Sequence, residues 1–466
     1  MKNCVFILML LIIFCCSFTW VSPPDVVLKS RVLVSGLSDP WSVVYGPDNQ
    51  LWVTESKGYR VLRVNPLTGE KQTVLDLASS REFPAFDKLK KLNQATPQGG
   101  LMGIAIHPDF LTGQPFVYVS YVYRHLAGNQ FLLKLQRFTF DSTSGQLKLP
   151  ITICDTIPAS NDHNGGRMLI APADDGHFLF YAVGDQGSGQ FSNGARQNKA
   201  QNILSYEGKI LRFNLMADSG GSWVPKDNPY GSQSAVWSFG HRNPQGLAFT
   251  TIAGRVRLYA SEHGPYSDDE INLIEKGKNY GHPLVIGYVD GNYDGLAASV
   301  SNENSYPGKW HSSYPYIGTE KRNADSIGAN FKAPVFSFYP TGHGALLQLF
   351  NSIKRGGNPR WKSYAPSGIA LYQSDAIPQW KNSLLITSLK TGRLLRLKLT
   401  KDGSIVSEPY EYAASAARYR DVAVSPDGTK IFLVTDSSSI TSGPTTKNPK
   451  AISERGCILE LSLQQD

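Results

Sequence analysis

The stretch Asp421-Val-Ala-Val-Ser-Pro-Asp-Gly, closely followed by Ile431-Phe-Leu-Val-Thr-Asp, shows the pattern on which the whole sequence is built. A short apolar strand leads into a Pro-Asp-Gly turn. A second strand, rich in β-branched and aromatic residues, then returns and ends in polar residues. Pro-Asp and Asp-Gly pairs favour tight turns between neighbouring strands. The stretch therefore predicts a β-hairpin with polar side chains at one end.

Five other parts of the sequence repeat this pattern. The copies begin at Trp41, Leu101, Arg167, Gln245 and Ser367. With the copy described above they make six, spaced at roughly fifty to eighty residues with one wider gap, as expected for a propeller of four-stranded sheets. The sequence thus predicts an all-β, six-bladed β-propeller whose strand ends converge around a central channel.

The wider gap separates the fourth and fifth repeats. It predicts a long insertion between about residues 288 and 364, rich in Gly, Asn, Ser and aromatic residues, which we expect to form loops on one face.

Across the 466 residues, 43 Gly, 28 Pro and only 18% charged residues favour strands punctuated by turns. The formal net charge of +8 comes from scattered cations, with no basic tract interleaved with aromatics, so we expect no nucleic-acid partner.

The first twenty residues have the pattern of a targeting segment. A short basic start precedes an unbroken apolar run over residues 5–14, which suits the core of a signal peptide and is too short to span a membrane. We therefore expect a signal peptide over residues 1–20, a propeller domain over 30–466 and export to the periplasm or the extracellular space. The rest of the sequence contains no second apolar run of this kind, so we expect no transmembrane span. Cys15 or Cys16 leaves lipid anchoring as an alternative to plain secretion.

Cys154 and Cys457 are the two remaining cysteines. An exported protein could pair them in a disulfide, but two free, buried thiols are the simpler interpretation. The sequence has no cluster of Cys and His at zinc-ligand spacing, which disfavours a structural zinc.

A histidine and an aspartate lie in Gly-rich loops of the third repeat, the histidine just before its first strand and the aspartate just after its second. His163 lies in Asn161-Asp-His-Asn-Gly-Gly, and a neutral imidazole can act as general base. Asp185, in Gly184-Asp-Gln-Gly, is suited to orient that imidazole. The alternative is a loop histidine without a catalytic role.

Donor side chains gather at other strand ends. Arg242, Asn243 and Gln245 share one turn and could grip a carboxylate or quinone oxygen, or simply cap that turn. Three cations, Lys390, Arg418 and Arg420, would suit a polyanionic ligand at the channel mouth; scattered surface charge is the alternative. Near the fourth repeat a Gly-Pro bend precedes three consecutive carboxylates, and bent backbone can present carbonyl oxygens to calcium.

Taken together, these stretches resemble the soluble glucose dehydrogenases that depend on pyrroloquinoline quinone (PQQ), and their aldose and sorbosone dehydrogenase relatives. The resemblance runs from about residue 32 to 463 and weakens in the insertion. It is carried by Gly46-Pro-Asp-Asn-Gln-Leu-Trp-Val-Thr-Glu, Gln98-Gly-Gly-Leu-Met-Gly, Asp162-His163, Gly184-Asp-Gln-Gly, Gly240-His-Arg-Asn-Pro-Gln-Gly-Leu-Ala-Phe, Gly264-Pro265 with Ser267-Asp-Asp-Glu-Ile-Asn-Leu, Ser388-Leu-Lys390 and Arg418-Tyr-Arg420-Asp.

The resemblance implies a quinone cofactor and calcium at the propeller mouth. Gly264 and Pro265 match backbone carbonyl donors to a calcium ion that also touches the quinone. A weaker local match implies a second calcium near Ile286, Tyr288 and Asp290. The residues implied to contact PQQ are Gln98, Arg242, Asn243, Gln245, Lys390, Arg418 and Arg420.

The resemblance also implies the chemistry. His163, steadied by Asp185, would remove a hydroxyl proton while hydride passes to the quinone, so that an aldose becomes its lactone. Electrons would then go to an external acceptor such as a cytochrome, a quinone or a dye, and a homodimer is a candidate assembly. His263 departs from the family, whose glucose-oxidising members commonly have glutamine there. Two alternative functions are a non-catalytic binding propeller and a calcium-dependent lactonase.

Overall fold

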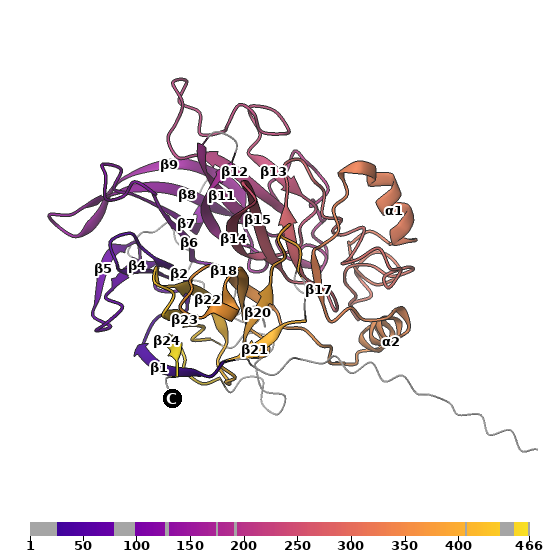
Figure 1. Ribbon diagram of the computed structural model, residues 1–466. Helices are drawn as coiled ribbons and strands as arrows, with labels where there is room; N and C mark the ends of the chain where they lie inside the picture. Colours follow the sequence, from indigo (N-terminus) through magenta and orange to yellow (C-terminus); the bar gives the residue numbers. More distant parts are fainter. Residues whose placement is uncertain are drawn as a thin grey trace, which may run out of the picture.

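Six four-stranded antiparallel sheets form a ring in the computed structural model, which confirms the six-bladed β-propeller (Figure 1). The structure describes residues 26–78, 98–125, 130–173, 176–190, 193–405, 408–438 and 452–464. The expected signal peptide lies outside the described residues.

Five blades each use four consecutive strands, ordered below from the innermost strand outward. Blade one contains β2 (Pro40–Tyr45), β3 (Leu51–Glu55), β4 (Arg60–Val64) and β5 (Lys71–Asp76). Blade two contains β6 (Leu101–Ile106), β7 (Phe116–His125), β8 (Gln130–Asp141) and β9 (Gln146–Pro158). Blade three contains β10 (Met168–Ala173), β11 (Gly176–Val183), β12 (Lys209–Asn214) and β13 (Val236–Phe239). Blade four contains β14 (Pro244–Ile252), β15 (Arg255–Glu262), β16 (Asp269–Ile274) and β17 (Phe336–Phe338). Blade five contains β18 (Pro366–Tyr372), β19 (Ser383–Ser388), β20 (Leu394–Lys398) and β21 (Tyr410–Tyr412).

The sixth blade closes the ring with strands from both ends of the chain. It contains β22 (Tyr419–Val424), β23 (Lys430–Thr435), β24 (Ile458–Leu463) and, outermost, β1 (Leu28–Val34). β1 pairs antiparallel with β24, with Leu28 opposite Leu463. The first strands of successive blades contact one another around the whole ring, so the polar residues at their ends meet at one mouth.

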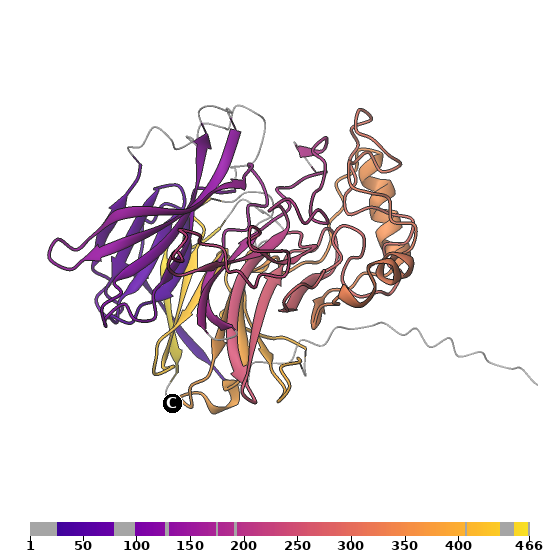
Figure 2. The ribbon, with the colours of Figure 1, turned by 90° about the horizontal axis from the view of Figure 1, so that it is seen from above.

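The insertion differs from the sequence expectation in two ways. The strand β17 divides the insertion into two parts. Residues 275–335 connect β16 to β17 within blade four, and only residues 339–365 connect blade four to blade five. The insertion also contains helices, where only loops were expected: α1 (Glu320–Ile327), α2 (His343–Lys354) and the short turn η3 (Gly328–Asn330); a further turn, η4 (Pro378–Trp380), lies in blade five. Both α-helices lie on one side of the propeller (Figures 1 and 2).

The hydrophobic core lies between neighbouring sheets. Trp52 on β3 is fully buried, and its ring meets Phe110 and Phe140 of blade two edge-on at centroid distances of 5.8 and 5.5 Å. Such aromatic packing between blades removes large apolar surfaces from water. Cys154 and Cys457 are free thiols, as the simpler interpretation held, although Cys154 is only half-buried.

A buried arginine joins four blades at the central channel. Arg167, just before β10, donates from Nε to the Gln245 carbonyl oxygen at 2.8 Å and from Nη1 to Ser42 Oγ at 2.9 Å. Nη1 also pairs closely with the Asp421 carboxylate, which accepts the Val43 backbone N–H at 2.8 Å. These partners lie on the innermost strands of blades four, one and six.

We predict that Arg167→Ala lowers the free energy of unfolding by about 3–5 kcal/mol, because it leaves the Asp421 carboxylate buried without its cation. The matched control is Arg31→Ala, which removes a 2.7 Å ion pair between Glu460 and an arginine side chain that is 48% exposed. We expect this control to lower the free energy of unfolding by about 1 kcal/mol or less, because exposed ion pairs contribute little. Urea unfolding of both variants measures the difference. Equal losses would show that the channel pair is no stronger than a surface pair.

Candidate active site

His163 lies in a tight loop between β9 and β10 and is only 5% exposed. Its backbone adopts φ +47°, a left-handed conformation that L-residues rarely adopt and that surrounding contacts must hold. The neighbouring Asn164 amide donates to the Gln98 carbonyl oxygen at 2.6 Å. A Cβ on Gly184 would meet the His163 carbonyl oxygen at 2.1 Å, so glycine is required where the end of β11 approaches this loop.

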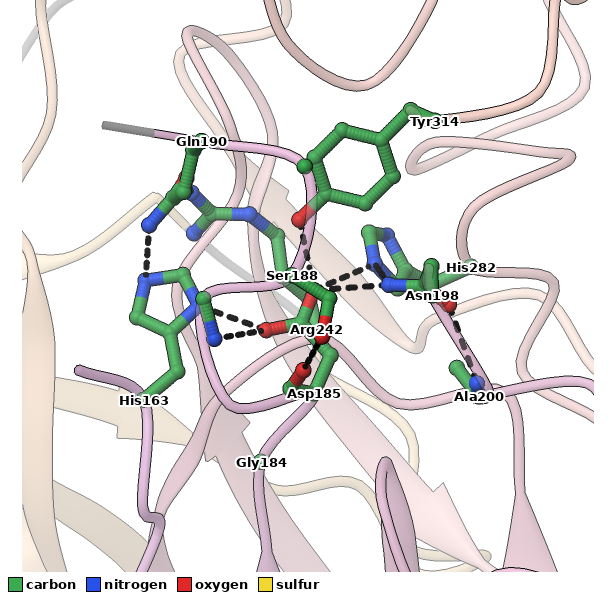
Figure 3. A network of polar contacts seen from close by, with 12 residues as sticks. His163, Gly184, Asp185, Ser188, Gln190, Asn198, Ala200, Arg242, His282 and Tyr314 are labelled. Atoms are coloured by element: carbon green, nitrogen blue, oxygen red, sulfur yellow. Dashed lines mark hydrogen bonds and ion pairs between the residues drawn. The ribbon is translucent and has the colours of Figure 1, made fainter. Parts of the chain in front are cut away.

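The His163 ring is held at both nitrogens (Figure 3). Nδ1 lies 2.7 Å from Asp185 Oδ1, and Nε2 lies 2.9 Å from the amide nitrogen of Gln190. Arg242 donates to the Gln190 amide oxygen at 2.8 Å, which fixes the orientation of that amide. Since the Gln190 nitrogen can only donate, His163 has its proton on Nδ1 and its lone pair on Nε2.

Asp185 is fully buried and accepts five hydrogen bonds. Burial alone would raise the pKa of Asp185, but His163 and His282 hold that pKa well below its ordinary value. Its partners besides His163 are the Gly187 N–H at 3.0 Å, Asn198 at 3.0 Å, His282 Nε2 at 2.9 Å and the Tyr314 hydroxyl at 2.6 Å. The carboxylate therefore stays ionised and fixes the imidazole.

Arg242 connects this pair to the loop after β15. Its Nη1 donates to the carbonyl oxygens of His263 and Gly264 at 3.1 and 2.9 Å. Two backbone oxygens thus converge on one positive group beside His163. Burial is the main cause that lowers the pKa of His263 well below its ordinary value, and the nearby positive charge of Arg242 acts in the same direction, so this imidazole is neutral.

The remaining predicted residues lie at the same mouth. Gln245 donates to Asn243 Oδ1 at 2.9 Å and accepts from Arg420 at 3.1 Å. Arg418 and Arg420 share the Asp436 carboxylate, with Nε–oxygen distances of 3.1 and 2.8 Å. Although burial opposes it, these two guanidiniums hold the pKa of Asp436 below its ordinary value.

Lys390 approaches the mouth from blade five. Its Nζ donates to the Trp361 carbonyl oxygen at 2.9 Å and lies 4.3 Å from the centroid of the Trp361 ring. Burial lowers the pKa of Lys390, while Asp269 acts in the opposite direction.

Several buried nitrogens at this mouth have no hydrogen-bond partner among the described residues. They are Trp41 Nε1, Arg242 Nε, Asn243 Nδ2 and His263 Nε2. Buried donors are nearly always paired in folded proteins. Three of these atoms, on Trp41, Arg242 and Asn243, are N–H donors, which indicates a site shaped for a ligand rich in acceptor oxygens.

The residues predicted for a second calcium form a separate group at the base of the insertion. The Ile286 N–H donates to Glu320 Oε1 at 2.9 Å, and Asp290 accepts the Asn292 N–H at 3.0 Å. Tyr288 is 37% exposed. Burial, together with the nearby Asp290 charge, raises the pKa of Glu320 to about 7.

The sequence profile of the family described as "Glucose / Sorbosone dehydrogenase" matches residues 37–318 and 357–441. The chain belongs to this family. It is therefore an oxidoreductase of the quinoprotein sugar dehydrogenase type.

Named relatives agree with this family. The chain is 35% identical over 439 residues to quinoprotein glucose dehydrogenase B of Acinetobacter calcoaceticus, covering 88% of this chain and 85% of that one. It is 28% identical to an aldose sugar dehydrogenase of Escherichia coli, covering 91% and 93%. The solved PQQ-bound aldose sugar dehydrogenase of Streptomyces coelicolor is 25% identical with a TM-score of 0.61, covering 95% and 100%.

Four residues of the candidate site were not predicted from the sequence: Gln190, Asn198, His282 and Tyr314. Gln190 follows Asp185 in a Gly-rich loop, a signal that could have marked it. Asn198 and His282 lie in loops without a recognisable motif, and Tyr314 comes from the insertion, which has no repeat pattern.

None of the helices among the described residues combines the length and apolar composition needed to cross a membrane.

We predict that Tyr314→Phe lowers the free energy of unfolding by about 1.5–3 kcal/mol, because it removes a buried hydrogen bond to the charged Asp185 carboxylate. Tyr316→Phe is the matched control, since Tyr316 is 55% exposed and only two residues away. Thermal and urea unfolding compare the two. Equal stability of both variants would mean that the Tyr314 hydroxyl does not support the carboxylate.

Proposed function

We propose that this dehydrogenase oxidises an aldose, or a related alcohol, to the lactone with PQQ and calcium at the propeller mouth, and passes electrons to an external acceptor. The observation that carries the proposal is the tautomer of His163. Its Nδ1 proton is bound to an ionised carboxylate, so its Nε2 lone pair is available to a substrate hydroxyl.

The mouth has the donor set that PQQ requires, because this cofactor is a flat ortho-quinone with three carboxylates. Trp41, Arg242 and Asn243 offer buried N–H groups without a partner in the described residues. Lys390 adds a cation from blade five. Arg418 and Arg420 share the Asp436 carboxylate and place two guanidinium groups at the mouth, which suits an anionic ligand.

Gly264 and Pro265 are the proposed calcium donors. The Gly264 carbonyl oxygen already converges with that of His263 on Arg242, which suits a site for positive charge made of backbone oxygens. Ile286, Tyr288 and Asp290, together with Glu320, are the proposed donors for a second ion. When bound, PQQ supplies a two-electron acceptor and calcium supplies positive charge beside it.

The protein's own residues then perform the proton transfer. The Gln190 amide occupies the position next to His163 Nε2, and we propose that a substrate hydroxyl takes its place there. His163 accepts the hydroxyl proton on Nε2, and the Asp185 carboxylate stabilises the resulting imidazolium at 2.7 Å. Arg242, freed from the Gln190 oxygen, can hold a substrate oxygen.

The proposal extends to the location of the protein. The apolar run over residues 5–14 supports export as a signal peptide, with lipid anchoring through Cys15 or Cys16 as the alternative.

No observation favours the binding propeller or the lactonase. The described channel carboxylates Asp185, Asp421 and Asp436 are each engaged by basic side chains, whereas a metal-dependent lactonase would need such oxygens for its ion.

We predict that the apo-protein binds PQQ at micromolar concentration only when calcium is present, and that aldoses then reduce the bound cofactor. Cofactor fluorescence measures binding, and the absorbance spectrum follows reduction across a panel of aldoses. Magnesium in place of calcium is the control, because its small octahedral shell suits backbone oxygens poorly. No binding with calcium at micromolar cofactor would overturn the quinoprotein proposal.

We predict that His163→Ala lowers kcat by about 10²–10⁴-fold, the contribution usual for a general base, with unchanged affinity for PQQ. His177→Ala is the control, since His177 is an exposed histidine on β11. Steady-state kinetics and cofactor titration separate the two effects. Full activity of the His163 variant would show that another group takes the proton.

A further inference from the structure

The segment between α1 and β19 contains an uninterrupted excess of positive charge. Residues 326–374 contain no Asp or Glu, although the chain has 38 such residues. The same stretch has five cations, namely Lys332, Lys354, Arg355, Arg360 and Lys362. Figures 1 and 2 show the part that bears α2 projecting on one side of the propeller.

Three of these cations, Lys354, Arg355 and Lys362, together with Lys309 from an earlier part of the insertion, form what we call the basic rim. Among the described residues none of the four pairs with a carboxylate, while Lys332 does, with Glu275 at 3.0 Å. Lys309, Arg355 and Lys362 are exposed. The charge of the rim is therefore open to solvent and to whatever approaches this face.

Direct contacts connect the rim to the mouth. Lys309 and Lys354 lie 5.1 and 5.7 Å from the Trp310 ring, and Lys354 also donates to the Lys309 carbonyl oxygen at 2.7 Å. Lys362 follows Trp361, the residue whose ring and carbonyl oxygen Lys390 contacts.

A continuous series of rings lies between these two points. From Trp361 it runs through Tyr266 and Phe350 to Trp310, at centroid distances of 5.1, 5.3 and 5.2 Å. Packed rings of this kind hold the rim at a fixed position beside the mouth. The rim is therefore a rigid part of the site entrance and not an independent tail.

We propose that the basic rim docks an acidic, one-electron carrier protein that reoxidises the enzyme. This inference rests on the proposed function, in which each turnover leaves two electrons and two protons on the cofactor. Two oxidised carriers each accept one electron, and the two protons pass to solvent. Electron transfer weakens steeply with distance, so a carrier gains most by docking beside the mouth.

Charge favours a carrier over the cofactor as the occupant. The anionic cofactor is matched by the half-buried Lys390 and the buried Arg418 and Arg420, which are less exposed than Lys309, Arg355 and Lys362 of the rim. The exposed rim remains uncompensated after that, and exposed charges of one sign accelerate the association of an oppositely charged protein by about 10–10³-fold at low salt.

The test uses full-length holoenzyme reduced by sugar, and one carrier in two charge states. Cytochrome c with succinylated lysines is acidic, and the unmodified protein is basic. Stopped-flow absorbance measures the second-order rate of haem reduction by wild type and by Arg355→Glu/Lys362→Glu. Lys29→Glu/Lys71→Glu is the matched control, because it makes the same change in net charge on exposed outer strands of blades six and one.

We expect the rim variant to reduce acidic cytochrome about tenfold more slowly at ~10 mM ionic strength, and to differ little from wild type near 1 M salt, where charges are screened. The basic carrier should react faster with the same variant, and the control variant should behave as wild type. Equal effects in both variants, or none, would overturn the proposal.

Two further measurements keep the interpretation unambiguous. Binding of acidic cytochrome to the apo-protein, measured by calorimetry at low salt, should weaken about tenfold in the rim variant. That result would support docking even if sugar failed to reduce the cofactor, in which case only the proposed function falls. A rim variant that slows PQQ association and leaves cytochrome binding unchanged would show that the rim serves cofactor loading and would overturn the proposal.

Discussion

The ion pair between Arg167 and Asp421 is the constraint on which the centre of the molecule depends. A six-bladed ring brings the innermost strands close together, and the charges of Arg167 and Asp421 must neutralise each other because both side chains are buried. Arg167 meets this condition by reaching partners on blades one, four and six. The blades are thereby fixed in register at the centre as well as through the closing strand β1.

This central pair also sets the positions of groups proposed to bind the cofactor. Gln245 gives its backbone oxygen to Arg167, while its side chain contacts Asn243 and Arg420 at the mouth. Asp421 directly follows Arg420, so the strand that buries the acid in the channel also places the neighbouring guanidinium beside Gln245 and Asp436 at the mouth. A shift of β22 by one residue would break the Arg167–Asp421 pair together with the Arg420 contacts at the mouth, and a shift of β14 would break the Arg167–Gln245 hydrogen bond together with the Gln245 side-chain contacts.

Much of the fold and site follows from the sequence, and the rest has identifiable reasons. Strand-turn repeats are local, so the six blades and the strand-end residues His163, Asp185 and Arg242 could be predicted. The residues that complete the site are not local: Tyr314 reaches Asp185 across 129 positions. Its segment has neither the strand period nor a long apolar helix face, and no pattern indicates which of its tyrosines turns inward.

The same lack of pattern explains the error about the insertion. β17 is three residues long, and its pairing with β16 depends on a return of the chain after a long excursion. A strand of three residues is too short to show the alternation of apolar and polar residues by which strands are predicted from sequence. The helix α1 was missed because it is brief and depends on a cap, in which Thr319 Oγ1 accepts the Arg322 N–H at 3.3 Å. Because β16 and β17 anchor the segment between them at both ends, that segment needs no repeat pattern of its own to bring Tyr314 to the Asp185 carboxylate. The repeats therefore place His163 and Asp185 beside each other, and the insertion adds the Tyr314 contact, which no repeat pattern predicts.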